Sequence, residues 1–375
     1  HIEAALLASP LYIKRNPKDF DIKRRVDPDM LWQFLHAQTD TWNRLVKRFK
    51  SGDAALDAII KDYNSKLDNG HSLVDILRKG LKIQGISVKL MQTKPTLAGE
   101  DSALHQLYLS NRFAVARQMR YSLDKADKGN ELDLCILLNG FPIITAELKN
   151  EGTGQNYTNG IWQYRHDRDP KNAMLRTALV HFVIDNNYAF MTTFLNGEDT
   201  AFLPFNVDSV NPQVPGDYAT SYLWRDIWQA DSLLNIIDHF IKNVQSDGKS
   251  VTYFPRYHQL RVVRNLIKWV GEDGPGHNYL IEHSAGSGKT KSMAWLAHQL
   301  VNLVNPDQTP VFDSIIMVTD RIVLNANMAD DVNAFATEAG VVKDIRRGSK
   351  KLAKAINEGG RIIVSTVQKF SYALS

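Results

Sequence analysis

The 375-residue chain is 43% hydrophobic and 23% charged, a composition typical of a globular protein with two or three domains. Its net charge of +4 is compatible with nucleic acid binding without establishing it, and its single cysteine, Cys135, excludes a disulfide framework and favours a reducing compartment. No apolar run reaches the ~18 residues of a membrane span and no signal peptide is evident, so we expect a cytoplasmic protein without a membrane partner. The first residue, His1, predicts a fragment of a longer chain.

The first hundred residues are predicted to be mostly helical. Asp27-Pro28 offers a cap and a first turn, and Trp32, Phe34 and Trp42 recur at helical spacing, which predicts that they belong to the core. The expected elements are helices at 30–50, 54–66, 72–80 and 101–117, and a strand at 86–91.

The stretch 131–149 is predicted to form two strands around a turn. Its first apolar run is interrupted by Asp133, Asn139-Gly140 is a turn signal, and the second run carries Glu147 and leads to Lys149. An aspartate followed by a Glu-x-Lys triplet is a spacing found in metal-dependent nucleases. Two carboxylates on one face would bind Mg²⁺ through oxygen, and Lys149 would orient or help to deprotonate a water that attacks a phosphodiester. Taken alone, the pattern also fits strand ends exposed to solvent.

The length of the turn decides whether these side chains meet. A two-residue loop in a regular ladder would pair Asp133 with Ala146, so that Asp133 would point away from Glu147. A three-residue loop with Gly140 in the left-handed conformation, or a single bulge in either strand, shifts the pairing by one residue. That shift brings the two carboxylates and the lysine to one face. We therefore predict an odd-length connection, with a bulge as its equivalent.

A helix is expected at 161–169, ending before Pro170. Its residues Gln163, Tyr164 and Arg165 are placed to reach a backbone phosphate near the metal site, although a surface helix end of mixed charge is the alternative reading. Strands at 180–184 and 188–193 would complete the sheet, and a helix is predicted at 224–243. The polar segment 245–250 is the expected linker. It divides the chain into domains at 1–245 and 246–375.

The second domain contains a phosphate-binding loop. A helix up to about residue 270 and a short strand at 279–282 lead to His283-Ser284-Ala285-Gly286-Ser287-Gly288-Lys289-Thr290, and a helix is expected at 291–304. Gly286, Ser287 and Gly288 would bring backbone N–H groups to the phosphates of ATP. Lys289 would contact the β and γ oxygens, and the hydroxyl of Thr290 would bind Mg²⁺. His283 stands where the strict motif has glycine.

Two further apolar runs, at 313–319 and 361–366, predict buried parallel strands. Polar residues follow their carboxyl ends and would line a nucleotide or nucleic acid groove: Asp320, Arg321, Thr366 and Gln368. No apolar strand ending in Asp-Glu follows the P-loop. We therefore expect the acidic pair that completes such a site to lie beyond Ser375.

Together these motifs resemble the restriction (R, motor and nuclease) subunit of type I restriction-modification enzymes, over nearly the whole chain. The matching runs are Asn139-Gly140-Phe141-Pro142, Glu147-Leu148-Lys149-Asn150, Gln163-Tyr164-Arg165 with Asp167-Arg168, Met191-Thr192-Thr193, Phe202-Leu203-Pro204-Phe205-Asn206, Phe254-Pro255-Arg256-Tyr257-His258-Gln259 and the P-loop.

The resemblance implies an α/β fold with a PD-(D/E)xK nuclease-like domain and an incomplete RecA-like domain of helicase superfamily 2. It implies catalytic roles for Gln163 and Tyr164 beside the nuclease triad, and adenine recognition by Arg256 and Gln259. It also implies DNA contacts at Arg321, within motif Ia. Such subunits translocate double-stranded DNA with ATP and cleave it, bound to specificity and methyltransferase subunits.

Two departures accompany the resemblance. Asn327 stands where the family tends to have glutamine, and Gly160 stands where a Gln-x-x-x-Tyr motif has its glutamine, so we expect Gln163 to substitute. Two other readings remain open from sequence, a helicase-nuclease of DNA repair and a translocase subunit whose nuclease has decayed. A requirement for a DNA end would distinguish the first of these.

Overall fold

The computed structural model describes residues 1–95, 99, 101–123, 130–246, 249–320, 322–335, 340–345 and 349–370. The chain forms two compact units, His1–Phe254 and Pro255–Ser375. Both contain helices and strands, in agreement with the predicted α/β class.

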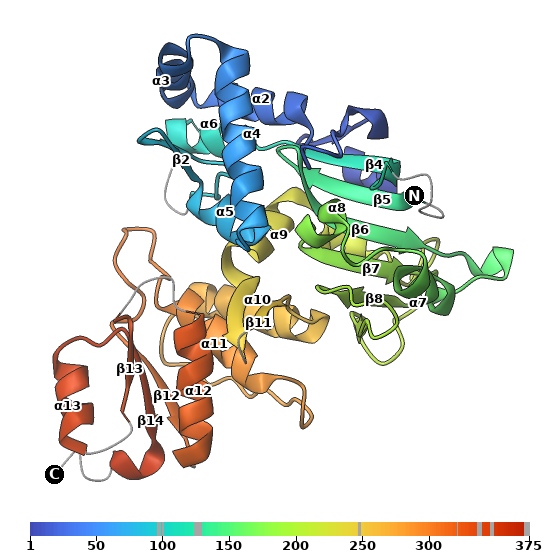
Figure 1. Cartoon of the computed structure of the whole chain (residues 1–375). Coiled ribbons are helices and arrows are strands. Elements are labelled where there is room, and N and C mark those ends of the chain that lie inside the picture. The colour runs from blue at the N-terminus through green and yellow to red at the C-terminus, as the bar shows by residue number, and fades with distance from the viewer. Residues whose placement is uncertain are drawn as a thin grey trace. The chain divides into compact units, whose positions relative to one another are not determined.

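The first unit is built around a mixed sheet, which in the described residues has seven strands in the order β1-β4-β5-β6-β7-β8-β9. Figure 1 shows β4 to β8 side by side. The pairs β1–β4 and β6–β7 are parallel, and the other neighbours are antiparallel. The strands are β1 (Tyr12–Lys14), β4 (Phe113–Arg120), β5 (Glu131–Leu138), β6 (Phe141–Leu148), β7 (Val180–Ile184), β8 (Ala189–Thr192) and β9 (Leu203–Pro204).

Helices and two small hairpins surround this sheet, and α7 packs on β6 and β7 while α8 packs on β6. The helices are α1 (Ile2–Leu7), α2 (Pro28–Ala37), α3 (Thr39–Phe49), α4 (Gly52–Asp68), α5 (Leu73–Lys79), α6 (Ala103–Leu109), α7 (Tyr157–His166), α8 (Ala173–Thr177) and α9 (Ala230–Asn235). Short 3₁₀-helices are η1 (Pro17–Asp19) and η2 (Glu151–Thr153), and π-helices are η3 (Leu223–Ile227) and η4 (Ile236–Phe240). The hairpins are β2 (Leu81–Ile83) with β3 (Ile86–Val88), and β10 (Lys242–Ser246) with β11 (Lys249–Tyr253).

The predicted cap of the first long helix is confirmed, but the helix is interrupted. Asp27 accepts a hydrogen bond from the backbone of Met30 at 3.1 Å, and Pro28 follows at the first helical position. Gln38 then leaves helical geometry, and its Nε2 donates to the Lys89 carbonyl at 2.9 Å, so two helices replace the predicted one. Phe34 and Trp42 are buried as predicted, whereas the core assignment of Trp32 was wrong because it is 39% exposed.

The predicted helix at 101–117 was wrong in its second half. Helix α6 ends at Leu109, and the following residues form β4, which pairs with both β1 and β5. The first four residues of β4, from Phe113 to Ala116, are all buried. A strand buried on both faces has no alternation of polar and apolar residues, so local periodicity cannot separate it from a helix.

The described residues of the segment predicted to be a linker, 245–246 and 249–250, belong to strands β10 and β11 instead. The preceding helix, predicted at 224–243, is divided into η3, α9 and η4. Thr193 donates a hydrogen bond to the carbonyl of Thr252 at 2.8 Å, which fastens the hairpin to the first unit. The compact units therefore divide after Phe254 rather than after residue 245.

The second unit has, in its described part, a parallel three-stranded sheet in the order β12-β14-β13. Its elements are α10 (Tyr257–Asp273), α11 (Lys289–Leu300), β12 (Ile315–Thr319), α12 (Ile322–Ala334), β13 (Val342–Asp344), α13 (Ser349–Asn357), β14 (Ile362–Thr366) and η5 (Val367–Lys369). Strands β12 and β14 confirm the two predicted parallel strands. Strand β14 is buried as predicted, but the predicted burial of β12 was wrong, because Ile316 and Val318 are 40% and 44% exposed. The strand predicted at 279–282 is not formed, and Leu280 is 96% exposed.

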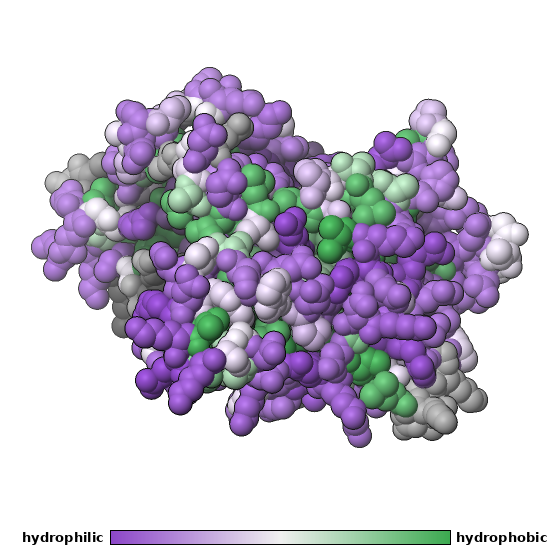
Figure 2. All heavy atoms as spheres, turned by 90° about the horizontal axis from the view of Figure 1, so that it is seen from above, coloured by the Kyte–Doolittle hydropathy of each residue, from purple (hydrophilic) through white to green (hydrophobic). Residues whose placement is uncertain are grey.

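The surface in Figure 2 is largely hydrophilic, with hydrophobic residues in small separate patches on the face shown. Among the helices in the described ranges, none combines the length and the apolar character needed to cross a membrane.

Candidate active site

The β5–β6 hairpin has a two-residue turn, so the predicted odd-length connection was wrong and its alternative, a bulge, is present. Asn139 and Gly140 both have positive φ, 51° and 91°, and Leu138 pairs with Phe141. The register then shifts, because Leu137 pairs with Pro142 while Ile136 pairs with Ile144. Proline has no N–H to donate to the ladder, which favours a bulge at this place.

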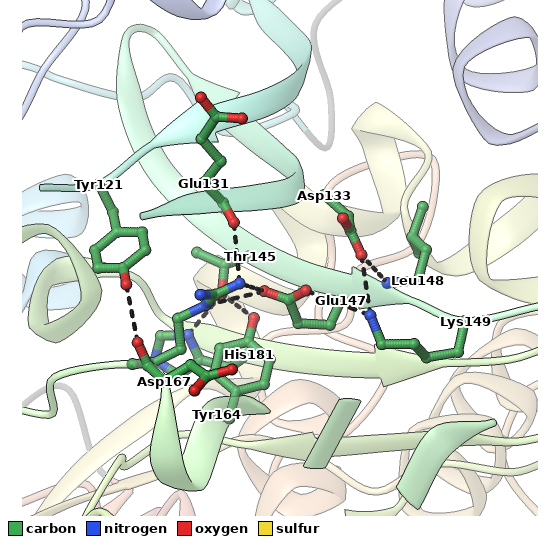
Figure 3. Close-up of polar contacts among 11 residues, drawn as sticks. Tyr121, Glu131, Asp133, Thr145, Glu147, Leu148, Lys149, Tyr164, Asp167 and His181 are labelled. Carbon is green, nitrogen blue, oxygen red and sulfur yellow. Dashed lines mark hydrogen bonds and ion pairs between the residues drawn. The ribbon is translucent and has the colours of Figure 1, made fainter. Parts of the chain in front are cut away.

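The bulge brings the predicted catalytic side chains to one face. Leu134 pairs with Ala146, and the same register places Asp133 opposite Glu147. The Nζ atom of Lys149 lies 3.5 Å from Oδ2 of Asp133 and 3.7 Å from Oε2 of Glu147. Figure 3 shows the three side chains converging. The three side chains of the predicted triad therefore meet, and a bulge in β6 brings them together rather than the odd-length loop that the sequence favoured.

Asp133 and Lys149 border an open cavity of about 310 Å³. The Asp133 side chain is 40% exposed, and its Oδ2 also accepts a hydrogen bond from the backbone of Leu148 at 2.8 Å. Arg117 and Glu3 line the same cavity and form an ion pair of 3.4 Å. The lining carries charges of both signs, because Asp185 also borders the cavity, and the buried Glu147 is not part of it.

Glu147 is the buried member of the site. Its Oε1 accepts hydrogen bonds from Nη2 and Nε of Arg168, at 2.7 and 3.1 Å. Its Oε2 is buried and has no hydrogen-bond partner. Burial raises the pKa of Glu147 to about 7, and the charge of Asp133 acts in the same direction, while Arg168 and Lys149 oppose them.

A buried relay of hydroxyl groups lies behind the carboxylates. Thr145 Oγ1 lies 2.7 Å from the hydroxyl of Tyr164 and 2.6 Å from Nδ1 of His181. Burial lowers the pKa of His181 to about 3, so the ring is neutral, and it also hydrogen-bonds the backbone of Leu175. We therefore assign Nδ1 as the acceptor, which makes Thr145 the donor to His181 and Tyr164 the donor to Thr145. The Tyr164 hydroxyl is therefore buried and hydrogen-bonded to Thr145, and its catalytic role stays a prediction.

The other predicted residues of α7 are placed differently from expectation. Gln163 has a buried Oε1 without a hydrogen-bond partner, and Arg165 donates to the carbonyl of Thr200 at 2.9 and 3.1 Å. Neither is hydrogen-bonded to the two carboxylates within the described structure, and their catalytic and DNA-binding roles stay predictions. Sequence reasoning included Arg168 in one of the matching runs but gave it no role in the site, because it lies beyond the end of α7 and nothing in the local sequence indicates that it contacts Glu147.

The second unit brings the predicted nucleotide-binding residues together. Lys289 donates to the carbonyl groups of His283 and Ser284, each at 2.9 Å. Nε2 of Gln259 donates to the carbonyl groups of Ser287 and Gly288 at 3.2 and 3.1 Å, and Oε1 of Gln259 accepts from the backbone of Arg256 at 2.9 Å. Gly286 and Gly288 both adopt positive φ. Thr290 follows Lys289 in the first turn of α11.

The ends of β12 and β14 also meet, as predicted for parallel neighbours. Nε2 of Gln368 donates to the carbonyl of Asp320 at 2.9 Å. Arg321, the predicted DNA contact, lies outside the described residues.

Comparison with known proteins finds one matching family model in each of the two units. A family model described as "Type I restriction enzyme R protein N terminus" matches residues 11–200, and a model described as "SWI2/SNF2 ATPase" matches residues 258–374. The chain is 24% identical over 304 residues to the type I restriction enzyme SauCOLORF180P endonuclease subunit of Staphylococcus aureus, and 23% identical over 315 residues to the SsaAORF53P endonuclease subunit of Staphylococcus saprophyticus.

Each of these alignments covers 77% of this chain and 30% of the relative, so the chain spans about a third of the length of these curated relatives. The first family model covers every strand of the large sheet except β9, together with α7, and the second begins within α10 and includes the P-loop. The chain therefore belongs to the type I restriction enzyme R protein family, and it matches the N-terminal part of such a protein.

Proposed function

We propose that the first unit is a metal-dependent nuclease of the PD-(D/E)xK type, and that the second unit is part of an ATP-driven motor for double-stranded DNA. The observation that carries the nuclease proposal is the convergence of Asp133, Glu147 and Lys149 on one face of the β5–β6 hairpin. In this proposal the chain acts with the specificity and methyltransferase subunits of a type I restriction complex.

The donor atoms present fit a hard divalent cation. Oε2 of Glu147 is a buried carboxylate oxygen that accepts no hydrogen bond and has only the Lys149 ammonium near it, at 3.7 Å, while the neighbouring Asp133 carboxylate reaches solvent. In the described part of the chain, no group of three or more His, Cys, Asp or Glu side chains is arranged to hold a metal. Mg²⁺ commonly binds through one or two carboxylates together with water and substrate phosphate, so Asp133 and Glu147 suffice as protein ligands.

When bound, Mg²⁺ would polarise a phosphate oxygen and lower the pKa of a coordinated water. The protein's own residues would act around it. The Lys149 side chain is 7% exposed and its ammonium lies between the two carboxylates, where it can orient the attacking water and offset negative charge on the phosphate. Arg117, on the wall of the same cavity, would exchange its ion pair with Glu3 for a DNA phosphate.

The second unit would supply ATP binding to a DNA motor. Lys289 is exposed and donates to carbonyl groups of its own loop, contacts that β and γ phosphate oxygens would replace. Gln259 contacts the loop backbone directly, so recognition of adenine by Arg256 and Gln259 would be transmitted to the phosphate-binding residues.

The decisive experiment uses the full-length subunit assembled with specificity and methyltransferase subunits. Asp133→Ala and Lys149→Ala should each abolish ATP-dependent cleavage of unmethylated circular DNA and leave DNA-stimulated ATP hydrolysis intact. Cleavage at the wild-type rate in either variant would show that the nuclease site lies elsewhere. A requirement for a DNA end would instead indicate a nuclease that works in DNA repair.

A further inference from the structure

The nuclease site lacks a side chain at the position where a Gln-x-x-x-Tyr motif would place its glutamine. Gly160 occupies that position, and a Cβ atom there would lie 2.6 Å from Cγ1 of Val183 and 3.5 Å from Cβ of Glu147. Helix α7 is therefore too close to β6 and β7 to admit a glutamine at residue 160. Gln163 does not compensate, because its buried Oε1 has no hydrogen-bond partner.

Arg168 is the residue that holds Glu147. Its side chain is 2% exposed, and Nη2 bonds both Oε1 of Glu147 and the carbonyl of Glu131, at 2.7 and 2.9 Å. Nε adds a second bond to the same Oε1 at 3.1 Å. The guanidinium also lies over the ring of Tyr121, 5.3 Å from its centroid.

Tyr121 is itself fixed by a hydrogen bond. Its hydroxyl donates to the carbonyl of Asp167 at 3.1 Å, next to Arg168 in the chain. Arg168 is thus restrained by a carboxylate, a backbone carbonyl and an aromatic ring. A side chain held from three directions can fix the rotamer of the carboxylate that it binds.

The distribution of these bonds between the two oxygens of Glu147 is unequal. Both bonds from Arg168 reach Oε1, while Oε2 lies on the side of Lys149 and accepts no hydrogen bond. A carboxylate anchored through one oxygen presents the other in a defined direction. Oε2 of Glu147 and the carboxylate of Asp133 are the two protein donors of the proposed metal site.

We propose that Arg168 is the positioning residue of the nuclease site, binding one oxygen of Glu147 so that the other is held ready for a divalent cation. It replaces the glutamine that Gly160 excludes. The inference rests on the proposed function, since it assumes that Asp133 and Glu147 bind a metal, and it assigns to Arg168 an indirect role, exerted through Glu147.

The test measures binding of Mn²⁺ alone to the 375-residue chain by titration calorimetry, without nucleotide or DNA. Arg168→Met should weaken Mn²⁺ binding by about 10- to 100-fold, the usual effect of removing a partner of a metal ligand. Arg168→Lys keeps the charge but loses the paired N–H donors, and should bind between the wild type and Arg168→Met. Arg15→Met is the matched control, because this arginine also binds a buried carboxylate, that of Asp27 rather than Glu147, and the variant should bind Mn²⁺ as the wild type does.

Circular dichroism shows whether a variant that binds Mn²⁺ more weakly is still folded. If Arg168→Met fails to fold, the folded Arg168→Lys variant decides the question through its Mn²⁺ affinity. Wild-type affinity in any folded Arg168 variant overturns the inference, even if that variant melts at a lower temperature. Glu147→Gln distinguishes the proposed function. If Glu147→Gln binds Mn²⁺ as tightly as the wild type does, the metal site itself is refuted, and the inference about Arg168 fails with it.

Discussion

Gln259 and Gly288 are in direct contact, since Nε2 of Gln259 donates to the Gly288 carbonyl at 3.1 Å and would lie 2.4 Å from a Cβ atom at residue 288. Helix α10 and the P-loop therefore share one surface. Glycine is favoured here for two reasons, its φ of +82° and the Gln259 amide, which would have to move away from the loop to admit a Cβ atom.

Gly288→Ala should weaken binding of a fluorescent ATP analogue by about tenfold or more, because an overpacked contact typically costs about 1–3 kcal/mol. Gly276→Ala is the control for backbone strain alone. Gly276 has φ +100° and open space around its Cα, so that variant should lose some stability and keep its affinity. Equal affinities in the two variants would show that the Gln259 contact does not constrain the loop.

Gly160 makes a second close approach, between α7 and the sheet. Gly160→Ala should destabilise the chain by about 1–3 kcal/mol, because the new methyl group would lie 2.6 Å from Cγ1 of the buried Val183. Adding Val183→Ala should recover part of this loss. Gly271→Ala, in a helix with open space at that position, should stabilise by about 0.5–1 kcal/mol. Urea unfolding checks all three, and a neutral Gly160→Ala variant would contradict the packing argument.

The Glu147–Arg168 pair should show strong coupling in stability. Removing one partner leaves the other charge buried without compensation, so Glu147→Gln and Arg168→Met should each cost about 3–5 kcal/mol. The double variant should cost much less than the sum, with a coupling of about 0.5–3 kcal/mol. Guanidinium unfolding of the four proteins measures this coupling. Additive effects would mean that the two side chains do not interact as the geometry indicates.

His181 should make the stability of the first unit depend on pH. Its pKa is about 3 in the folded chain, below the ordinary value of 6.5, because burial disfavours the charged ring. Between these two values the unfolded chain binds a proton that the folded chain does not, so the unfolding free energy falls as the pH falls below 6.5. This loss is largest below pH 3.

His181→Gln should remove that loss. Between pH 7.5 and pH 5.5 the wild type should lose about 1.4 kcal/mol more stability than the variant. A full proton contributes about 1.4 kcal/mol per pH unit, and over these two units the unfolded chain binds about half a proton on average. The exposed His71 provides the control, and His71→Gln should follow the wild-type curve. Parallel curves for the wild type and His181→Gln would show that His181 is not held neutral.

Local patterns were sufficient for those parts of the fold that are determined by neighbouring residues. Asp27-Pro28 does cap a helix, Asn139-Gly140 does form a turn, and the strands at 180–184 and 361–366 lie within one residue of their predicted ends. The geometric requirement that Asp133 and Glu147 share a face was also sound. It could not choose between a longer loop and a bulge, because both satisfy the same count.

The parts of the fold and of the site that were not predicted depend on contacts between segments far apart in the sequence. Strand β4 forms because β1 and β5 lie on either side of it, and nothing in its own residues records those neighbours. Arg168 reaches Glu147 only once α7 has packed on the sheet, and the restriction at Gly160 comes from Val183. Pro142 did carry a local signal, since a proline inside a central strand indicates a bulge.

The bulge beside Pro142 has a consequence for how this hairpin can vary. The length of the two-residue turn and the extra residue at Ile143 together set the register of the two strands. That register decides whether Asp133 and Glu147 lie on the same face of the sheet. A turn that is one residue longer or shorter shifts the register by one residue, which moves one carboxylate to the opposite face of the sheet. Loss of the bulge at the same time would restore the register. Insertions at Asn139-Gly140 should therefore be tolerated in pairs, or singly in chains where a regular strand replaces the bulged one.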